Sequence, residues 1–166
     1  LKHIQACSFV NPRLVPGWAD AEKVVESFDA HEDVEYTGLY FNGNGLDRAL
    51  AFKDKLTISG SISLTASEGF TKKNLNRTHA ENMAAMERHV MSHLELGIPV
   101  NRIGVMAAFG CNYQGDISPA TVIKTLEDGM QIAAKTGAEI TLFSLADTMG
   151  WAAPHRIERV VGEVRN

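Results

Sequence analysis

The segment VNRIGVMAAF, residues 100–109, decides the fold class of this chain. It is almost uninterruptedly apolar, and its valine, isoleucine and phenylalanine residues favour an extended strand. A strand that is apolar on both faces is typical of a parallel sheet whose two faces are covered by helices. The segment therefore predicts an α/β protein rather than an antiparallel sheet with one face in water.

Strand and helix patterns alternate along the rest of the chain. Further strands are predicted at residues 3–10, 34–41, 56–64 and 140–145. Helices are predicted at residues 19–28, 46–52, 78–96, 119–137 and 154–164. The clearest helix signals are a capping box of Thr78 and Glu81, and Pro119 directly after Ser118. Such βα units build either a doubly wound sheet or a (β/α)8 barrel, and no Gly-x-Gly-x-x-Gly follows the first strand to favour dinucleotide binding.

Length and composition describe an ordinary globular domain. The chain has 166 residues, of which 45% are hydrophobic and 22% charged, and its formal net charge is −4. This balance excludes a collagen-like chain, a disordered tail and a disulfide scaffold, and it offers no basic surface for nucleic acid. No apolar run approaches the ~18 residues of a membrane span. Cys7 and Cys111 fit free thiols in a reducing compartment, so a cytoplasmic location is expected.

The polar clusters of the chain follow the predicted strands. Ligands bind at the carboxyl ends of the strands in both fold types, so Asp147 and Thr148, after the last strand, form the first candidate site. An Asp at this position can accept a substrate hydroxyl proton or cap the following turn, and the residues alone leave both readings open. Ser144 on the same strand either lines the pocket or is a buried hydroxyl satisfied by the backbone.

Three further features have a structural explanation that outweighs the functional one. Cys111 is interpreted as a small buried residue rather than a nucleophile, because no motif pairs it with a His. The lysine-containing segment 67–74 could receive a carboxylate or a phosphate, but it is interpreted as a solvated loop. His89 and His93 have zinc-ligand spacing on a helix, yet lack the acidic neighbour of His-Glu-x-x-His, and are interpreted as surface or groove residues.

Four segments carry more specific motifs. They are SFVNPRLVPGWAD (residues 8–20), TASEGFTKKNLN (65–76), AFGCNYQG (108–115) and LADTMG (145–150). In this order they resemble the second-, fourth-, fifth- and sixth-strand motifs of the 3-hydroxy-3-methylglutaryl-CoA lyases. The resemblance implies an α/β fold of the (β/α)8 TIM-barrel type, of which this chain covers about five βα units, strands two to six. Residues 1–166 would then form one partial catalytic domain without an internal boundary.

The resemblance also implies a chemistry. A divalent cation, Mg²⁺ or Mn²⁺, would bind the hydroxyl and carboxylate of a 3-hydroxy-3-methylglutaryl-CoA-like thioester. A base would remove the hydroxyl proton, and retro-Claisen cleavage would give acetyl-CoA and a keto acid. By position Asp147 is the expected catalytic residue. The expected substrate-binding residues are Ser8, Ser144, Thr148, Asn74 and Gln5.

The chain departs from the family pattern at several points. Gln5 stands where a Glu is expected, Asn112 replaces a Pro, and Gly104 replaces an aromatic residue, which implies a bulkier acyl group. The Arg-Asp pair of strand one and the His-x-His motif of strand seven, which carry the metal ligands in the family, do not occur here. No metal ligand is therefore assigned within this chain, and the chain is expected to be a piece of a longer enzyme.

Two alternative functions stay open. The first is a Claisen-type synthase that condenses an acyl-CoA with a 2-keto acid, as in related barrel enzymes. The second is a catalytically inactive barrel that only binds its ligand, which Gln5 and the missing metal ligands favour. The resemblance further implies a homodimer as the expected assembly.

Overall fold

The computed structural model describes residues 1–165 as parallel strands connected by helices. The strands are β1 (His3–Ser8), β2 (Glu35–Leu39), β3 (Gly60–Thr65), β4 (Val100–Met106) and β5 (Leu142–Leu145). The helices are η1 (Pro16–Trp18), α1 (Ala21–Glu26), α2 (Gly43–Leu50), α3 (Glu68–Leu75), α4 (His79–Glu95), α5 (Pro119–Thr136) and α6 (Pro154–Arg165). Every strand predicted from the sequence is present. In the part of the chain that the structure describes, no helix combines the length and apolarity needed to cross a membrane.

The chain divides after Ile58 into two compact units. In the first unit, β1 and β2 form a parallel pair in which Ser8 lies opposite Leu39. Phe9 and Val25 are buried in its hydrophobic core, which also includes the face of α1 that packs against the strands. The organisation as one domain without an internal boundary stays a prediction.

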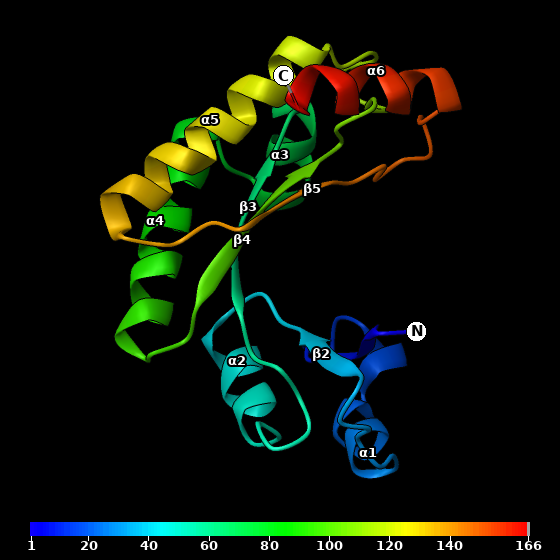
Figure 1. The fold of residues 1–166 in the computed structure, drawn as a ribbon, viewed down its shortest axis with the longest axis vertical. Coiled ribbons are helices and arrows are strands. Elements are labelled where there is room, and N and C mark those ends of the chain that lie inside the picture. Colours follow the sequence, from blue (N-terminus) through cyan, green and yellow to red (C-terminus); the bar gives the residue numbers. More distant parts are fainter. Residues whose placement is uncertain (166) are drawn as a thin grey trace. The chain divides into compact units, whose positions relative to one another are not determined.

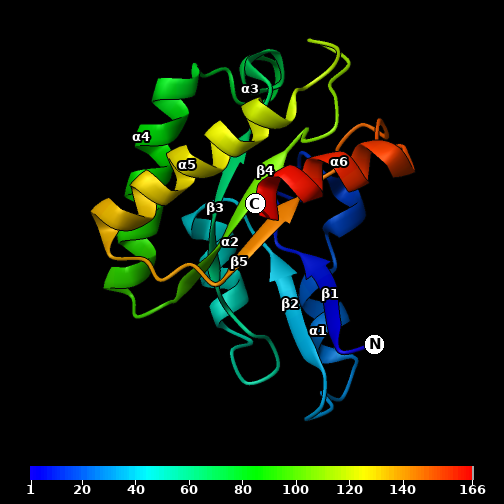
Figure 2. The same ribbon diagram turned by 45° about the horizontal axis from the view of Figure 1, so that its top comes forward.

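The second unit contains a parallel sheet in the order β3-β4-β5. Helices α4 and α5 lie side by side on one face of this sheet, and α6 packs against α5 (Figures 1 and 2). Ile103 and Val105 are fully buried on the helix-covered face. Gly129 of α5 lets the helix approach closely, because a Cβ at this position would lie 2.9 Å from Ile103. The core of the unit therefore lies between the sheet and its helices.

The opposite face of this sheet is polar. Ser63, Gly104 and Ser144 lie side by side across the three strands, and Ser63 is exposed. Arg102, two residues before Gly104 on β4, is also exposed. The expectation that β4 is apolar on both faces is therefore wrong, since the helices of this unit cover only one face of the strand.

The helix starts follow the local sequence signals. In the predicted capping box, the Thr78 N–H donates to Glu81 Oε2 at 2.7 Å and the Glu81 N–H donates to Thr78 Oγ1 at 3.2 Å. The interpretation of segment 67–74 as a solvated loop is wrong, because most of it forms α3. The buried Ser67 side chain caps this helix by accepting the Phe70 N–H at 3.1 Å.

The histidine pair of α4 belongs partly to the core. The rings of His89 and His93 have centroids 4.1 Å apart, and His93 Nδ1 lies 2.8 Å from the His89 carbonyl oxygen. His93 is buried, so of the two interpretations, surface or groove residue, the surface one is wrong for His93. Burial of His89, together with the nearby His93, lowers the pKa of His89 from 6.5 to about 4.

This lowered pKa predicts a pH-dependent stability. Below pH 6.5 the unfolded chain protonates His89 while the folded chain does not, so stability falls as the pH decreases from 6.5 toward about 4. The variant His89→Gln is expected to lose less stability than the original protein between pH 7.5 and pH 5, by on the order of 1 kcal/mol for a partly exposed ring. Urea unfolding at both pH values measures this difference, with His155→Gln as a control for an exposed helical imidazole. Equal pH sensitivity of the original protein and His89→Gln would contradict the assignment.

Candidate active site

The carboxyl ends of β3, β4 and β5 form the rim on which the sequence placed the first candidate site. Because the three strands are parallel neighbours, the loops that follow them begin at the same edge of the sheet. Asp147 and Thr148 follow β5 directly. Residues 107–118 connect β4 to α5, and Ser67 follows β3. The rim is thus built by three successive βα connections of the second unit.

Both oxygens of the Asp147 carboxylate accept backbone hydrogen bonds. Oδ1 accepts the Trp151 N–H at 2.7 Å, and Oδ2 accepts the Ala152 N–H at 3.0 Å. Asp147 therefore caps the turn that leads into α6, and its side chain is also exposed. A carboxylate has about four acceptor positions, so each oxygen keeps room for a further donor. Capping and a catalytic role are compatible in this arrangement.

Thr148 joins the ends of two strands. Its Oγ1 accepts the N–H of Ala107, the first residue after β4, at 2.8 Å. Ala107 is fully buried and has a positive φ of 54°, a conformation that non-glycine residues rarely adopt. The Thr148 side chain thus supports a strained strand end, and its hydroxyl proton stays available to another acceptor.

The variant Thr148→Val is expected to lower the free energy of unfolding by about 1–3 kcal/mol. It keeps the shape of the side chain but leaves the buried Ala107 N–H without an acceptor. The variant Thr148→Ser keeps the acceptor oxygen and serves as the matched control. The free energies of unfolding of the two variants, measured with urea, should therefore differ clearly. Coinciding unfolding curves would show that the hydrogen bond contributes little.

Ser144 lies on the open face of β5, half-buried and beside Gly104 of β4. A Cβ at Gly104 would lie 3.2 Å from Ser144 Oγ and 3.9 Å from Ser63 Oγ. The absence of a side chain at Gly104 therefore leaves a gap between two hydroxyl groups.

Asn74 lies on the exposed surface of α3, where its Nδ2 donates to the Phe70 carbonyl oxygen at 3.3 Å. Ser8 and Gln5 lie in the first unit, on β1. Ser8 is buried at the carboxyl end of this strand, whereas Gln5 is exposed. The substrate-binding roles of Asn74, Ser8 and Gln5 stay predictions.

Cys111 takes part in a small buried cluster. Its Sγ accepts the Ser67 O–H at 3.0 Å and the Tyr113 N–H at 3.4 Å. Ser67 Oγ also lies 3.1 Å from Gln114 Oε1, which places the loop after β3 against the loop after β4. These contacts favour the interpretation of Cys111 as a packed structural residue.

Arg156 is a rim residue that sequence reasoning missed. Its guanidinium donates to the Phe109 carbonyl oxygen at 2.6 Å and to Asp116 Oδ1 at 2.7 Å, so it holds both ends of the loop after β4. A cation in the first turn of a helix is unfavourable next to the positive end of the helix dipole. This conflict was the available signal that Arg156 has a specific partner.

The rim residues do not by themselves make a cation site. Across residues 1–165, no group of three or more His, Cys, Asp or Glu side chains is arranged to hold a metal ion. Within the described residues, Asp147 therefore does not belong to a group of three or more such side chains.

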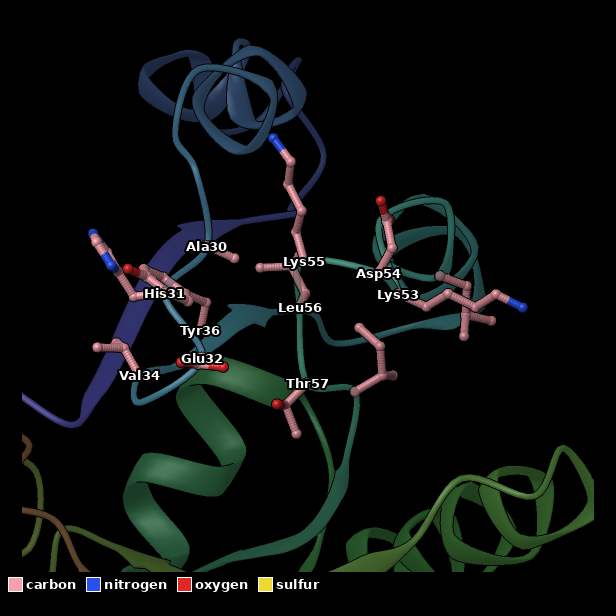
Figure 3. Close-up of a pocket in the computed structure, with 12 residues that line it drawn as sticks. Ala30, His31, Glu32, Val34, Tyr36, Lys53, Asp54, Lys55, Leu56 and Thr57 are labelled. Carbon is pink, nitrogen blue, oxygen red and sulfur yellow. The ribbon is translucent and has the colours of Figure 1, made fainter.

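A separate cavity of about 610 Å³ lies in the first unit, between the loop that precedes β2 and the segment that follows α2 (Figure 3). Its lining includes Glu32, Tyr36 and Asp54. Lys55 also lines it, but its Nζ donates to carbonyl oxygens at the end of α1, including that of Phe28 at 2.8 Å. The cavity adjoins the amino end of β2, whereas ligands of such folds bind at the carboxyl ends of strands. It is therefore not the candidate active site.

Comparison with known proteins finds one kind of enzyme among the proteins that this chain resembles. No family model matches the chain. The cytoplasmic 3-hydroxy-3-methylglutaryl-CoA lyase of Homo sapiens is 33% identical over 165 residues, which are 99% of this chain and 42% of the relative. The chain spans about half the length of the curated relatives it matches.

Solved structures agree with the sequence relatives. The crystal structure of the HMG-CoA lyase of Bacillus subtilis superimposes with a TM-score of 0.80 at 27% identity, over 99% of this chain and 52% of that chain. An HMG-CoA lyase from Acinetobacter baumannii, in complex with coenzyme A and 3-methylmalate, gives a TM-score of 0.76 at 29% identity, over 99% of this chain and 50% of that chain. The predicted fold is thereby confirmed: the chain has the fold of part of a (β/α)8 barrel. The resemblance to HMG-CoA lyases is confirmed as well.

Proposed function

We propose, from its homology to the 3-hydroxy-3-methylglutaryl-CoA lyases, that this chain is part of a carbon–carbon lyase. The observation that carries this proposal is the match to these lyases over 99% of the chain, with Asp147 at the carboxyl end of a barrel strand. The substrate would be a thioester similar to 3-hydroxy-3-methylglutaryl-CoA. The products would be acetyl-CoA and a keto acid.

Asp147 is the base of the proposed reaction. Its carboxylate takes the proton from the substrate's C3 hydroxyl, and C3 becomes a carbonyl as its bond to C2 breaks. The bonding electron pair passes to the acyl-CoA fragment as an enolate, which a proton then converts to acetyl-CoA. The two backbone N–H groups that hold Asp147, from Trp151 and Ala152, fix the direction in which the carboxylate accepts this proton.

Hydroxyl and amide groups orient the substrate. We assign this role to Thr148 and Ser144 at the end of β5, and to Ser8, Gln5 and Asn74 on the other elements. The gap at Gly104, between two serine hydroxyls, supports a substituent larger than methyl on the acyl group. Gln5 keeps the hydrogen-bonding shape of a Glu without its charge.

A divalent cation, Mg²⁺ or Mn²⁺, is the proposed cofactor of the whole protein. Such a cation acts as a Lewis acid toward the substrate oxygens when it is bound. Because the described residues hold no cluster of three ligands, its ligands would come from outside this chain. A homodimer and a cytoplasmic location are further proposals, the latter supported by a relative with that location in its name.

Acetyl-CoA formation tests the proposal. The protein that carries this chain is incubated with a panel of 3-hydroxy-3-alkylglutaryl-CoA thioesters and Mg²⁺ or Mn²⁺, and acetyl-CoA is quantified. Turnover of at least one thioester, abolished by a chelator, is expected. Absence of turnover across the panel would overturn the lyase, and thiol release from acetyl-CoA with 2-keto acids would indicate a condensing synthase instead.

A catalytically inactive binding module is the second candidate. It is favoured by the uncharged Gln5 on β1 and by the lack of a three-ligand metal cluster among the described residues. Calorimetry of the same protein with coenzyme A thioesters distinguishes the two candidates. Binding without turnover would support the module.

A further inference from the structure

Trp151 occupies a central place in the turn between β5 and α6. Its backbone N–H donates to Asp147 Oδ1 at 2.7 Å, and the next N–H, from Ala152, donates to Oδ2 at 3.0 Å. The direction of the Asp147 carboxylate therefore depends on where the backbone of Trp151 lies. Any contact that fixes the Trp151 side chain also fixes this backbone.

The indole of Trp151 reaches the loop that follows β4. Its Nε1–H donates to Asn112 Oδ1 at 2.8 Å. The indole has this one donor, and a half-buried tryptophan normally finds a partner for it. The backbone of Asn112 is held as well, because its own N–H donates to Met149 Sδ at 3.0 Å.

The indole ring also packs on the backbone of Gly110. A Cβ at this position would lie 2.5 Å from Trp151 Cδ2, so only a glycine admits the ring at this distance. Gly110 has a φ of 153°, a value that further favours glycine. The ring contact and the Asn112 hydrogen bond together lock the indole onto the loop after β4.

We propose that Trp151 is a positioning residue that couples Asp147 to the loop after β4, with Asn112 as its partner. This inference rests on the proposed lyase function. One residue holds the base through its backbone and the neighbouring loop through its ring, so a change at Asn112 alters the orientation of Asp147 without touching it. Asn112 is the position at which the sequence departs from the family's proline. Its amide oxygen accepts the indole N–H of Trp151, which a proline could not do.

Two single variants and their combination test the coupling in the protein that carries this chain. Trp151→Phe keeps a ring over Gly110 and removes the indole N–H, whereas Asn112→Ala removes the acceptor oxygen. Each is expected to lower kcat roughly ten- to a hundredfold with little change in KM, because the base is misdirected while the substrate still binds. Since both variants remove the same hydrogen bond, the double variant should be no worse than the more impaired single variant.

Conservative variants complete the test. Asn112→Asp keeps an acceptor oxygen at the same place, so its kcat should stay within about threefold of that of the original protein. Trp18→Phe, in η1 of the first unit, controls for the loss of a tryptophan and should leave kcat unchanged. The coupling would be overturned if the fall in kcat of the double variant equalled the product of the falls in the two single variants. It would also be overturned if Asn112→Asp lowered kcat as much as Asn112→Ala does.

Amide hydrogen exchange gives a measurement that does not depend on turnover. The amides of Trp151 and Ala152, which donate to Asp147, should exchange about tenfold faster in Asn112→Ala. The Ala107 amide, which donates to Thr148, should exchange at its original rate. If the original protein produces no acetyl-CoA, the lyase proposal fails, and unchanged exchange at Trp151 and Ala152 would separately overturn the positioning role.

Discussion

An Asp147→Asn protein is expected to turn over its thioester roughly 10²- to 10⁴-fold more slowly than the original, which is the usual contribution of a positioned general base. The amide has nearly the shape of the carboxylate but cannot take a proton from the C3 hydroxyl. KM should change far less than kcat, because Thr148 and Ser144, the hydroxyl groups proposed to orient the substrate, remain. Steady-state release of acetyl-CoA measures both quantities.

The capping role of Asp147 has to be separated from this effect. The two carboxylate oxygens accept the Trp151 and Ala152 N–H groups, and an asparagine offers only one carbonyl oxygen. One N–H therefore loses its acceptor, and because these hydrogen bonds are solvent-exposed the cost in the free energy of unfolding is that of a lost cap, about 0.5–2 kcal/mol. Asp116→Asn, in the loop after β4, is the matched control, since Asp116 accepts a hydrogen bond from Arg156 in the same rim. Asp116→Asn should keep turnover within about threefold, in line with a surface ion pair. Equal turnover in the two variants would reduce Asp147 to a structural cap.

The sequence predicted that Asp147 and Thr148 lie at the carboxyl end of a strand, because this position follows from topology. Parallel strands bring their carboxyl ends to one edge, so a polar residue directly after a strand lies at the rim whatever the loop does next. Asp147 and Thr148 were placed in this way. Their partners were not predictable, because the Trp151, Ala152 and Ala107 N–H groups reach them only through the particular turns of the two loops. One of these turns requires a positive φ at Ala107, for which an alanine gives no sequence signal.

The missed helix has a similar explanation. The segment of α3 contains Gly69 and Asn74, both unfavourable within helices, and its two lysines suggested a solvated surface. The helix forms because tertiary contacts fix its start. Ser67 is completely buried, and its hydroxyl donates to Cys111 Sγ. The same hydroxyl oxygen accepts the Phe70 N–H and so caps the helix. The exposed face of β4 was missed for a related reason, since an apolar run does not reveal which face the helices cover.

A Gly110→Ala protein is expected to lose about 3 kcal/mol of its free energy of unfolding. The added Cβ would lie 2.5 Å from Trp151 Cδ2 and 2.6 Å from Trp151 Cγ, so the ring has to leave its place. Overpacking of this kind costs about 1–3 kcal/mol, and holding alanine at a φ of 153° adds a further strain of similar size. Urea unfolding of the original and variant proteins measures the loss.

Two comparisons assign this loss to the ring. Gly115, in the same loop, has a φ of 83° but no heavy atom within 4 Å of a built Cβ, so Gly115→Ala carries the backbone strain alone and should cost about 1–2 kcal/mol. In a Trp151→Ala background the ring is absent, and adding Gly110→Ala should then cost no more than Gly115→Ala does. Gly110→Ala should thus be the more damaging of the two glycine variants only while the indole is present. Equal losses for both glycine variants in the original protein would mean that the ring moves aside freely, and the contact between Trp151 and the loop after β4 would then hold nothing in place.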